Sequence, residues 1–121
     1  MSTTDFIQEV ITDDGYVAPK ELARILHITQ RELASIAGLR RDAVSKRARV
    51  RSLATQKRLR EMLEILNRVS AWCGGPGRAL AWFRSQPLPS FGDQTAEDLL
   101  KAGRGDALRA YLTRVSQGGY A

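Results

Sequence analysis

The 121-residue sequence has little of what secreted, metal-binding and membrane proteins require. It holds one cysteine, Cys73, and one histidine, His27, so no internal disulfide can form and no set of His and Cys zinc ligands is available. No apolar run approaches the roughly 20 residues that span a bilayer. The acidic start lacks the basic and apolar regions of a secretory signal. We therefore expect a cytoplasmic protein with no metal site and no cofactor.

Catalytic groups are equally scarce. His27 falls between two expected helices, where a surface or half-buried position is far more common than a catalytic one. The segment GGPG at residues 74–77 lacks the Lys-Ser/Thr that completes a phosphate-binding loop, and no strand precedes it. Adjacent acids, such as those at residues 13–14 and 97–98, are typical of turns and helix starts. We therefore expect that the protein is not an enzyme.

Helical periodicity is present almost throughout, and no segment alternates like a strand. The pattern predicts an all-α fold with helices near residues 4–11, 19–26, 30–37, 41–50, 55–72, 78–86, 96–102 and 107–117. Expected helix starts are Thr4 or Asp5, Pro19, Thr29 with Glu32, Thr95 with Asp98, and Asp106; Gly38 and Gly118 are expected stops. The glycine-rich break after Cys73 divides the chain into residues 1–73 and 74–121. These are one domain, or two very small ones that share a core.

Positive charge is concentrated in one segment. Residues 40–60 contain nine of the 19 Lys and Arg residues and a single acid, whereas the whole chain has a net charge of only +6. Cations gathered on one surface are typical of nucleic-acid binding, because neutralised phosphates release counterions. The alternative is a solvated helix face with no partner.

Residues 30–49 have the spacing of a helix-turn-helix. Ala34 is small where two helices would cross, Gly38 tolerates a tight turn, and Val44 is apolar midway along the second helix. Leu33, Ala37 and Leu39 fill the other inward positions. The spacing resembles the DNA-binding element of Xre/Cro-type repressors, and the alternative is a plain helix hairpin. Under the DNA-binding interpretation the candidate contacts are Arg40, Arg41, Asp42, Ser45, Lys46 and Arg49 on the second helix, with Thr29 and Gln30 at the start of the first.

The C-terminal half carries an ordered set of aromatic, apolar and glycine residues. Trp82 precedes a proline-containing loop that ends at Phe91-Gly92, and DLL at residues 98–100 follows. Gly105, a helix with Leu112 and Val115, and a Gly-aromatic-Ala end complete the order. This set resembles the toxin-binding domain of the Xre/MbcA/ParS antitoxins, although Ala96 stands where that family usually has proline.

The resemblance implies an antitoxin of a two-gene module. It implies a RES-domain toxin that consumes NAD⁺ as partner, an active site covered by the antitoxin's C-terminal region, and repression of the module's own promoter. The toxin-binding residues it suggests are Trp82, Phe91, Leu100, Tyr111, Gly118, Gly119, Tyr120 and Ala121. A homodimer or a larger toxin–antitoxin complex is expected. The alternative function is a free-standing repressor whose C-terminal half serves only dimerisation, and the tail itself either frays or orders against a partner.

Overall fold

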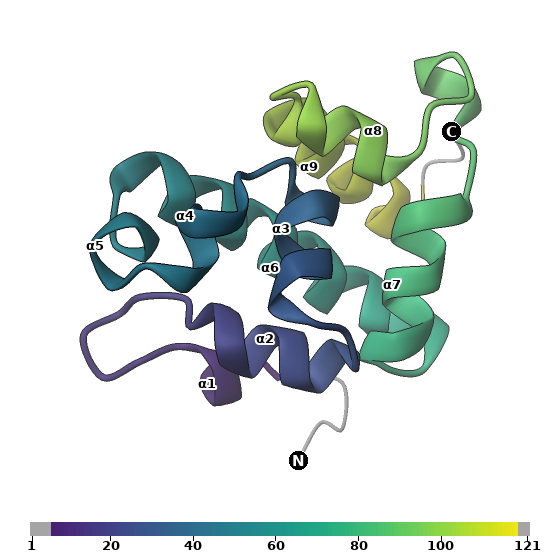
Figure 1. Ribbon diagram of the computed structural model, residues 1–121. Helices are drawn as coiled ribbons and strands as arrows, with labels where there is room; N and C mark the ends of the chain where they lie inside the picture. The colour runs from purple at the N-terminus through teal and green to yellow at the C-terminus, as the bar shows by residue number, and fades with distance from the viewer. Residues whose placement is uncertain (1–5, 119–121) are drawn as a thin grey trace.

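The computed structural model describes residues 6–118 and confirms the all-α prediction. These residues form nine α-helices and one short 3-10 helix, with two isolated bridges and no strand (Figure 1). The elements are α1 (Ile7–Val10), α2 (Pro19–Leu26), α3 (Gln30–Ala37), α4 (Arg41–Ser45), α5 (Arg47–Val50), α6 (Leu53–Cys73), α7 (Pro76–Ser85), η1 (Pro89–Phe91), α8 (Ala96–Lys101) and α9 (Gly105–Ser116).

Most helix ends follow the predicted local signals. Pro19 is the first residue of α2. Thr29 with Glu32, and Thr95 with Asp98, form complete capping boxes at the starts of α3 and α8. Left-handed glycines follow α3 at Gly38 and α9 at Gly118, as predicted. Local side-chain chemistry therefore sets these boundaries.

Four boundaries differ from the prediction. The helix expected over residues 41–50 is broken at Lys46, whose backbone is extended (φ −99°, ψ 121°). The long helix α6 starts at Leu53 and not at Thr55, because the Ser52 hydroxyl caps it by accepting a hydrogen bond from the Thr55 amide. Pro76 opens α7 two residues early, and α9 starts at Gly105 instead of Asp106. The predicted caps Thr4 and Asp5 lie outside the described residues.

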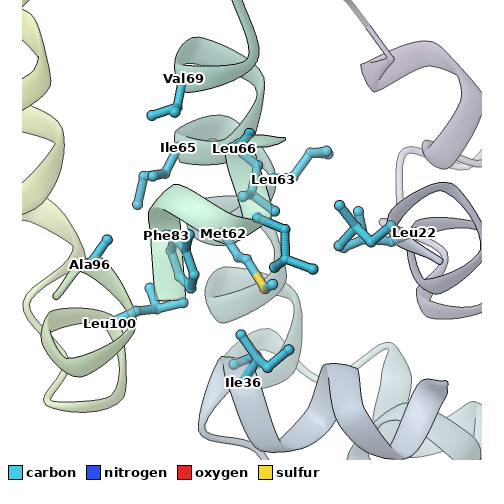
Figure 2. Packing of buried hydrophobic residues seen from close by; sticks show 14 of the residues in the cluster. Leu22, Ile36, Met62, Leu63, Ile65, Leu66, Val69, Phe83, Ala96 and Leu100 are labelled. Carbon is cyan, nitrogen blue, oxygen red and sulfur yellow. The ribbon is translucent and has the colours of Figure 1, made fainter. Parts of the chain in front are cut away.

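The long helix α6 forms the centre of the core. Its predicted apolar face is buried throughout, at Leu59, Met62, Leu63, Leu66 and Val69. Figure 2 shows Phe83 of α7 and Leu100 of α8 directed towards this helix, with Leu22 and Ile36 around other parts of it. One hydrophobic cluster therefore runs across the break after Cys73, and the two halves of the sequence share a core.

Candidate nucleic-acid and protein-binding surfaces

Helices α3 and α4 form a hairpin with a tight turn. Gly38 is left-handed (φ 71°, ψ 32°), and the Leu39 amide closes the turn by donating to the Ala34 carbonyl at 2.8 Å. Ala34 and Val44 are 2 % and 3 % exposed. Leu33 and Ala37 are also buried and Leu39 is half-buried, so the residues predicted to point inward do so. On the other side of α4, Arg41 and Ser45 are exposed.

Four cations on this hairpin and its exit have no partner within the described part of the chain. Arg40, Arg41, Lys46 and Arg47 are exposed, and none has an ion pair or side-chain hydrogen bond within residues 6–118. Ser45 lies one turn after Arg41 and donates its hydroxyl to the Arg41 carbonyl at 3.2 Å. Arg40, Arg41, Asp42 and Ser45 line an open hollow of about 360 Å³. We call the four cations, together with Ser45, the α4 basic surface.

Asp42 does not lie free for base recognition as the sequence suggested. Its Oδ2 accepts from the Arg49 guanidinium at 3.3 Å, and its Oδ1 is buried without a partner among the described residues. Arg49 is therefore also engaged, and it ties α5 back to α4 across the break at Lys46. The break occurs without a proline or glycine, which is why the sequence pattern missed it.

The start of α3 is a weaker phosphate site than predicted. The Thr29 hydroxyl accepts from the Glu32 amide at 3.0 Å, and the Thr29 amide donates to the Glu32 carboxylate at 2.9 Å. This backbone hydrogen bond lowers the pKa of Glu32, so a carboxylate already occupies the positive end of the helix. Thr29 is exposed and Gln30 half-buried, but a phosphate at this end would face Glu32.

The other cations of the basic segment have partners within the chain. Arg51 pairs with Asp14 at 3.3 Å and lies over the Tyr16 ring. Lys57 pairs with Glu61 at 3.3 Å, Arg58 donates to the Ala37 carbonyl at 2.8 Å, and Arg60 donates to the Gly15 carbonyl. The structure thus divides a uniform run of positive charge into a free part, residues 40–47, and an engaged part, residues 49–60.

A second surface lies on the C-terminal half. Phe91 and Tyr111 meet edge to face, with ring centroids 5.7 Å apart. The Arg104 guanidinium lies 5.4 Å from the Phe91 centroid, and that of Arg114 lies 6.0 Å from the Tyr111 centroid. Both arginines are exposed and have no acidic partner among the described residues. The sequence missed them because only the fold places them over the two rings.

The predicted toxin-binding residues separate into three groups. Trp82, Phe91 and Tyr111 are half-buried and keep part of their surface accessible. Leu100 is fully buried against α6 and cannot contact a partner, which corrects that prediction (Figure 2). Gly118 is exposed at the end of α9, whereas Gly119, Tyr120 and Ala121 lie outside the described residues.

Comparison with known proteins gave no match to a family model, a curated protein or a solved structure. Within residues 6–118, no cluster of three or more His, Cys, Asp or Glu side chains has the arrangement of a metal site. None of the helices in that part of the chain combines the length and apolar character of a membrane span.

Proposed function

We propose that the protein is a DNA-binding antitoxin, which binds promoter DNA through the α4 basic surface and a protein toxin through its C-terminal half. The observation that carries the DNA-binding part is the set of four exposed cations without partners on the outward side of the α3–α4 hairpin. Cations that the fold leaves without a partner can be neutralised by phosphates, and this neutralisation releases the counterions condensed on the nucleic acid.

The arrangement of the α3–α4 hairpin supports contact between the start of α4 and the bases of DNA. In helix-turn-helix proteins the N-terminal residues of the second helix face base edges in the major groove. Arg40 and Arg41 stand at that position here, and Ser45 follows one turn later on the Arg41 side. Arginine can donate two hydrogen bonds to guanine O6 and N7. Lys46 and Arg47 lie beyond the end of α4, and we expect them to contact phosphates.

The test replaces free cations and engaged cations in parallel. Arg41→Ala with Lys46→Ala should weaken binding to the protein's own promoter. A base contact by Arg41 costs about 1–3 kcal/mol, and each lost phosphate contact reduces the slope of log affinity against log salt by about 1. Lys57→Ala with Arg60→Ala removes the same charge from the engaged part of the segment and should change affinity much less. Equal losses of DNA affinity in both double variants would indicate that binding depends on the overall charge and not on a specific surface at α4.

The toxin-binding part of the proposal is supported by the aromatic and arginine residues of the C-terminal half. Arginine and tyrosine are prominent among the residues that dominate protein interfaces. Arg104 and Arg114 are each held against a ring, so little side-chain freedom is lost when a partner binds. The resemblance to Xre/MbcA/ParS antitoxins supports a RES-domain toxin as that partner.

Co-expression with the RES-domain protein of the neighbouring reading frame tests this part, with growth and cellular NAD⁺ as readouts. Tyr111→Ala and Arg114→Ala should weaken the complex and restore toxicity. Deleting residues 119–121 should restore toxicity while the complex still co-purifies, if the tail covers the active site. Absence of any such neighbour, or of any complex with wild-type protein, would favour the free-standing repressor.

A further inference from the structure

An open hollow of about 510 Å³ lies beside the α4 basic surface. Residues of the α3–α4 turn, α4, α5 and the start of α6 line it, namely Gly38, Leu39, Arg40, Asp42, Ala43, Ala48, Arg49, Ser52 and Thr55. The chain bends at Lys46, and none of the residues of α5 is buried. The core therefore does not fill the space between the two short helices. Small-molecule sites have volumes of about 300–1,000 Å³, and this hollow falls in that range.

Much of the lining is apolar. Leu39, Ala43 and Ala48 contribute side chains of carbon and hydrogen only. The Ser52 hydroxyl is already engaged, because it donates to the Thr55 hydroxyl at 3.0 Å and accepts from the Thr55 amide at 3.2 Å. A molecule in the hollow would thus meet hydrocarbon on several sides. Its polar group would be bound by the charged residues of the lining.

Three charged side chains line the hollow, and one of them is free. Asp42 Oδ2 lies 3.3 Å from the Arg49 guanidinium, so these two charges neutralise each other. Arg40 is exposed and has no ion pair or side-chain hydrogen bond within residues 6–118. The lining therefore carries one net positive charge. A single carboxylate matches it and can accept two parallel hydrogen bonds from a guanidinium, whereas a dianionic phosphate would leave excess negative charge beside Asp42.

We propose that this hollow binds a small apolar carboxylic acid, whose carboxylate pairs with Arg40. The hydrocarbon part of the ligand packs against Leu39, Ala43 and Ala48. Arg40 and Asp42 also line the 360 Å³ hollow of the α4 basic surface, so the two hollows share a wall. A ligand that holds Arg40 withdraws this cation from DNA and lowers DNA affinity. That consequence rests on the proposed function, whereas binding of the ligand does not.

The test titrates the purified full chain with benzoate and with hexanoate and follows the backbone amides by NMR. Both probes should shift the amides of residues 38–49. Benzamide has the shape of benzoate but no charge, and it should bind about tenfold more weakly or worse, as expected when a charged hydrogen bond is lost. Arg40→Gln should weaken benzoate binding by a similar factor.

Arg41→Gln is the matched control for charge. Arg41 is also an exposed cation without a partner in the described residues, but it lines the 360 Å³ hollow and not this one. This variant should bind benzoate like wild type. Ala48→Leu should weaken both probes without changing the charge, because the larger side chain occupies the hollow. Ala48 is exposed, so the fold should tolerate leucine, and an unchanged melting temperature checks this.

Three outcomes would overturn the proposed site. They are the absence of shifts with millimolar benzoate and hexanoate, equal binding of benzamide and benzoate, and equal weakening by Arg40→Gln and Arg41→Gln. A promoter titration with and without benzoate tests the consequence for DNA. Unchanged DNA affinity at saturating benzoate would overturn the competition for Arg40. Wild-type protein that binds benzoate but no promoter DNA would contradict only the proposed function and would support the ligand site.

Discussion

The α4–α5 segment and the contact between α6 and α9 are both rich in charge, but they use it in opposite ways. In residues 40–47 four cations have no partner within the described chain, and the helices are four and five residues long. Between α6 and α9 the charged groups meet one another across the interface. The comparison shows that composition alone does not identify a binding surface, because what matters is which charges the fold leaves unsatisfied.

Arg109 is at the centre of the α6–α9 contact. It forms ion pairs with Glu64 at 3.3 Å, with Glu61 at 3.9 Å and with Asp106. The hydrogen bond from Arg109 lowers the pKa of Asp106, and the same bond raises the pKa of Arg109. Arg68 adds donors to the Arg109 carbonyl and the Thr113 hydroxyl, each at 3.2 Å. Within the described residues, the charged groups of this contact are therefore paired with one another.

Substitution at Gly38 should have the largest effect, because this residue forms the turn between α3 and α4 and also packs against α6 and α8. A Cβ there would lie 2.8 Å from an Arg58 nitrogen and 3.0 and 3.3 Å from Lys101 atoms of α8. The left-handed backbone adds a strain of about 1–3 kcal/mol for a side chain. Gly38→Val should therefore destabilise the whole protein by about 3 kcal/mol and weaken DNA and partner binding together.

Gly15→Val measures the effect of backbone strain without the steric contacts that a side chain at Gly38 would make. Gly15 is also left-handed (φ 86°), but no atom lies within 4 Å of its Cβ position. Chemical denaturation should show a smaller loss in the free energy of unfolding for Gly15→Val than for Gly38→Val. Equal losses would mean that the contact of Gly38 with α8 contributes nothing, and that the two halves are less coupled than the shared core indicates.

Gly105→Ala tests how tightly the contact between α6 and α9 is packed around Glu61. The first residue of α9 faces the buried carboxylate of Glu61, and a Cβ would lie 2.6 Å from its Cδ. We expect a loss of about 1–3 kcal/mol in the free energy of unfolding, as for other overpacked sites. Gly77→Ala, at a helical glycine with no atom within 4 Å, should be neutral or stabilising. A Gly105→Ala variant as stable as wild type would show that Glu61 moves aside freely.

Arg58 and Arg47 test the distinction between engaged and free cations directly. Arg58 satisfies the carbonyl of Ala37 at the end of α3, so Arg58→Ala should cost about 1–2 kcal/mol of stability. Arg47→Ala should change stability by less than about 0.5 kcal/mol but should reduce DNA affinity. Thermal unfolding and a DNA titration on the same two variants measure both quantities. The opposite ranking in either assay would contradict the division of the basic segment.

The sequence predicted the elements that depend on local chemistry. Capping boxes at Thr29 and Thr95, the proline at the start of α2 and the glycine after α3 are all decided by residues within one turn. The apolar face of α6 followed from helical periodicity. These parts were accessible because the energy that fixes them comes from neighbours in the chain.

The missed features depend on contacts between distant residues. Asp42 was predicted to contact a base, but it forms an ion pair with Arg49. Arg49 lies beyond a helix break that no proline or glycine marks in the sequence. Leu100 was predicted to contact a partner, but its position on α8 directs its side chain into the core. Arg104 was not chosen, since only folding brings it over Phe91. Periodicity gives the face of a helix, but it does not say whether another helix or solvent meets that face.

The smallest predicted effect is on the pH dependence of stability at acidic pH. It compares the equivalent capping boxes at the starts of α3 and α8, one in each half of the chain. Hydrogen bonds from the Thr29 and Thr95 amides lower the pKa values of Glu32 and Asp98 below their ordinary values of 4.5 and 3.8. Each carboxylate therefore stabilises the fold above its ordinary pKa, and this contribution is lost as the pH falls through the lower pKa of the folded protein.

Glu32→Gln and Asp98→Asn should each make the free energy of unfolding less dependent on pH below about 4.5, with a small loss at neutral pH. Urea denaturation at a series of pH values measures both changes. Because α3 and α8 contribute to one hydrophobic cluster, each variant should shift a single unfolding transition. If Glu32→Gln altered an early transition and Asp98→Asn a later one, the halves would unfold separately. The free charges of α4 would then stand on a unit that can open while the α6–α9 contact remains closed.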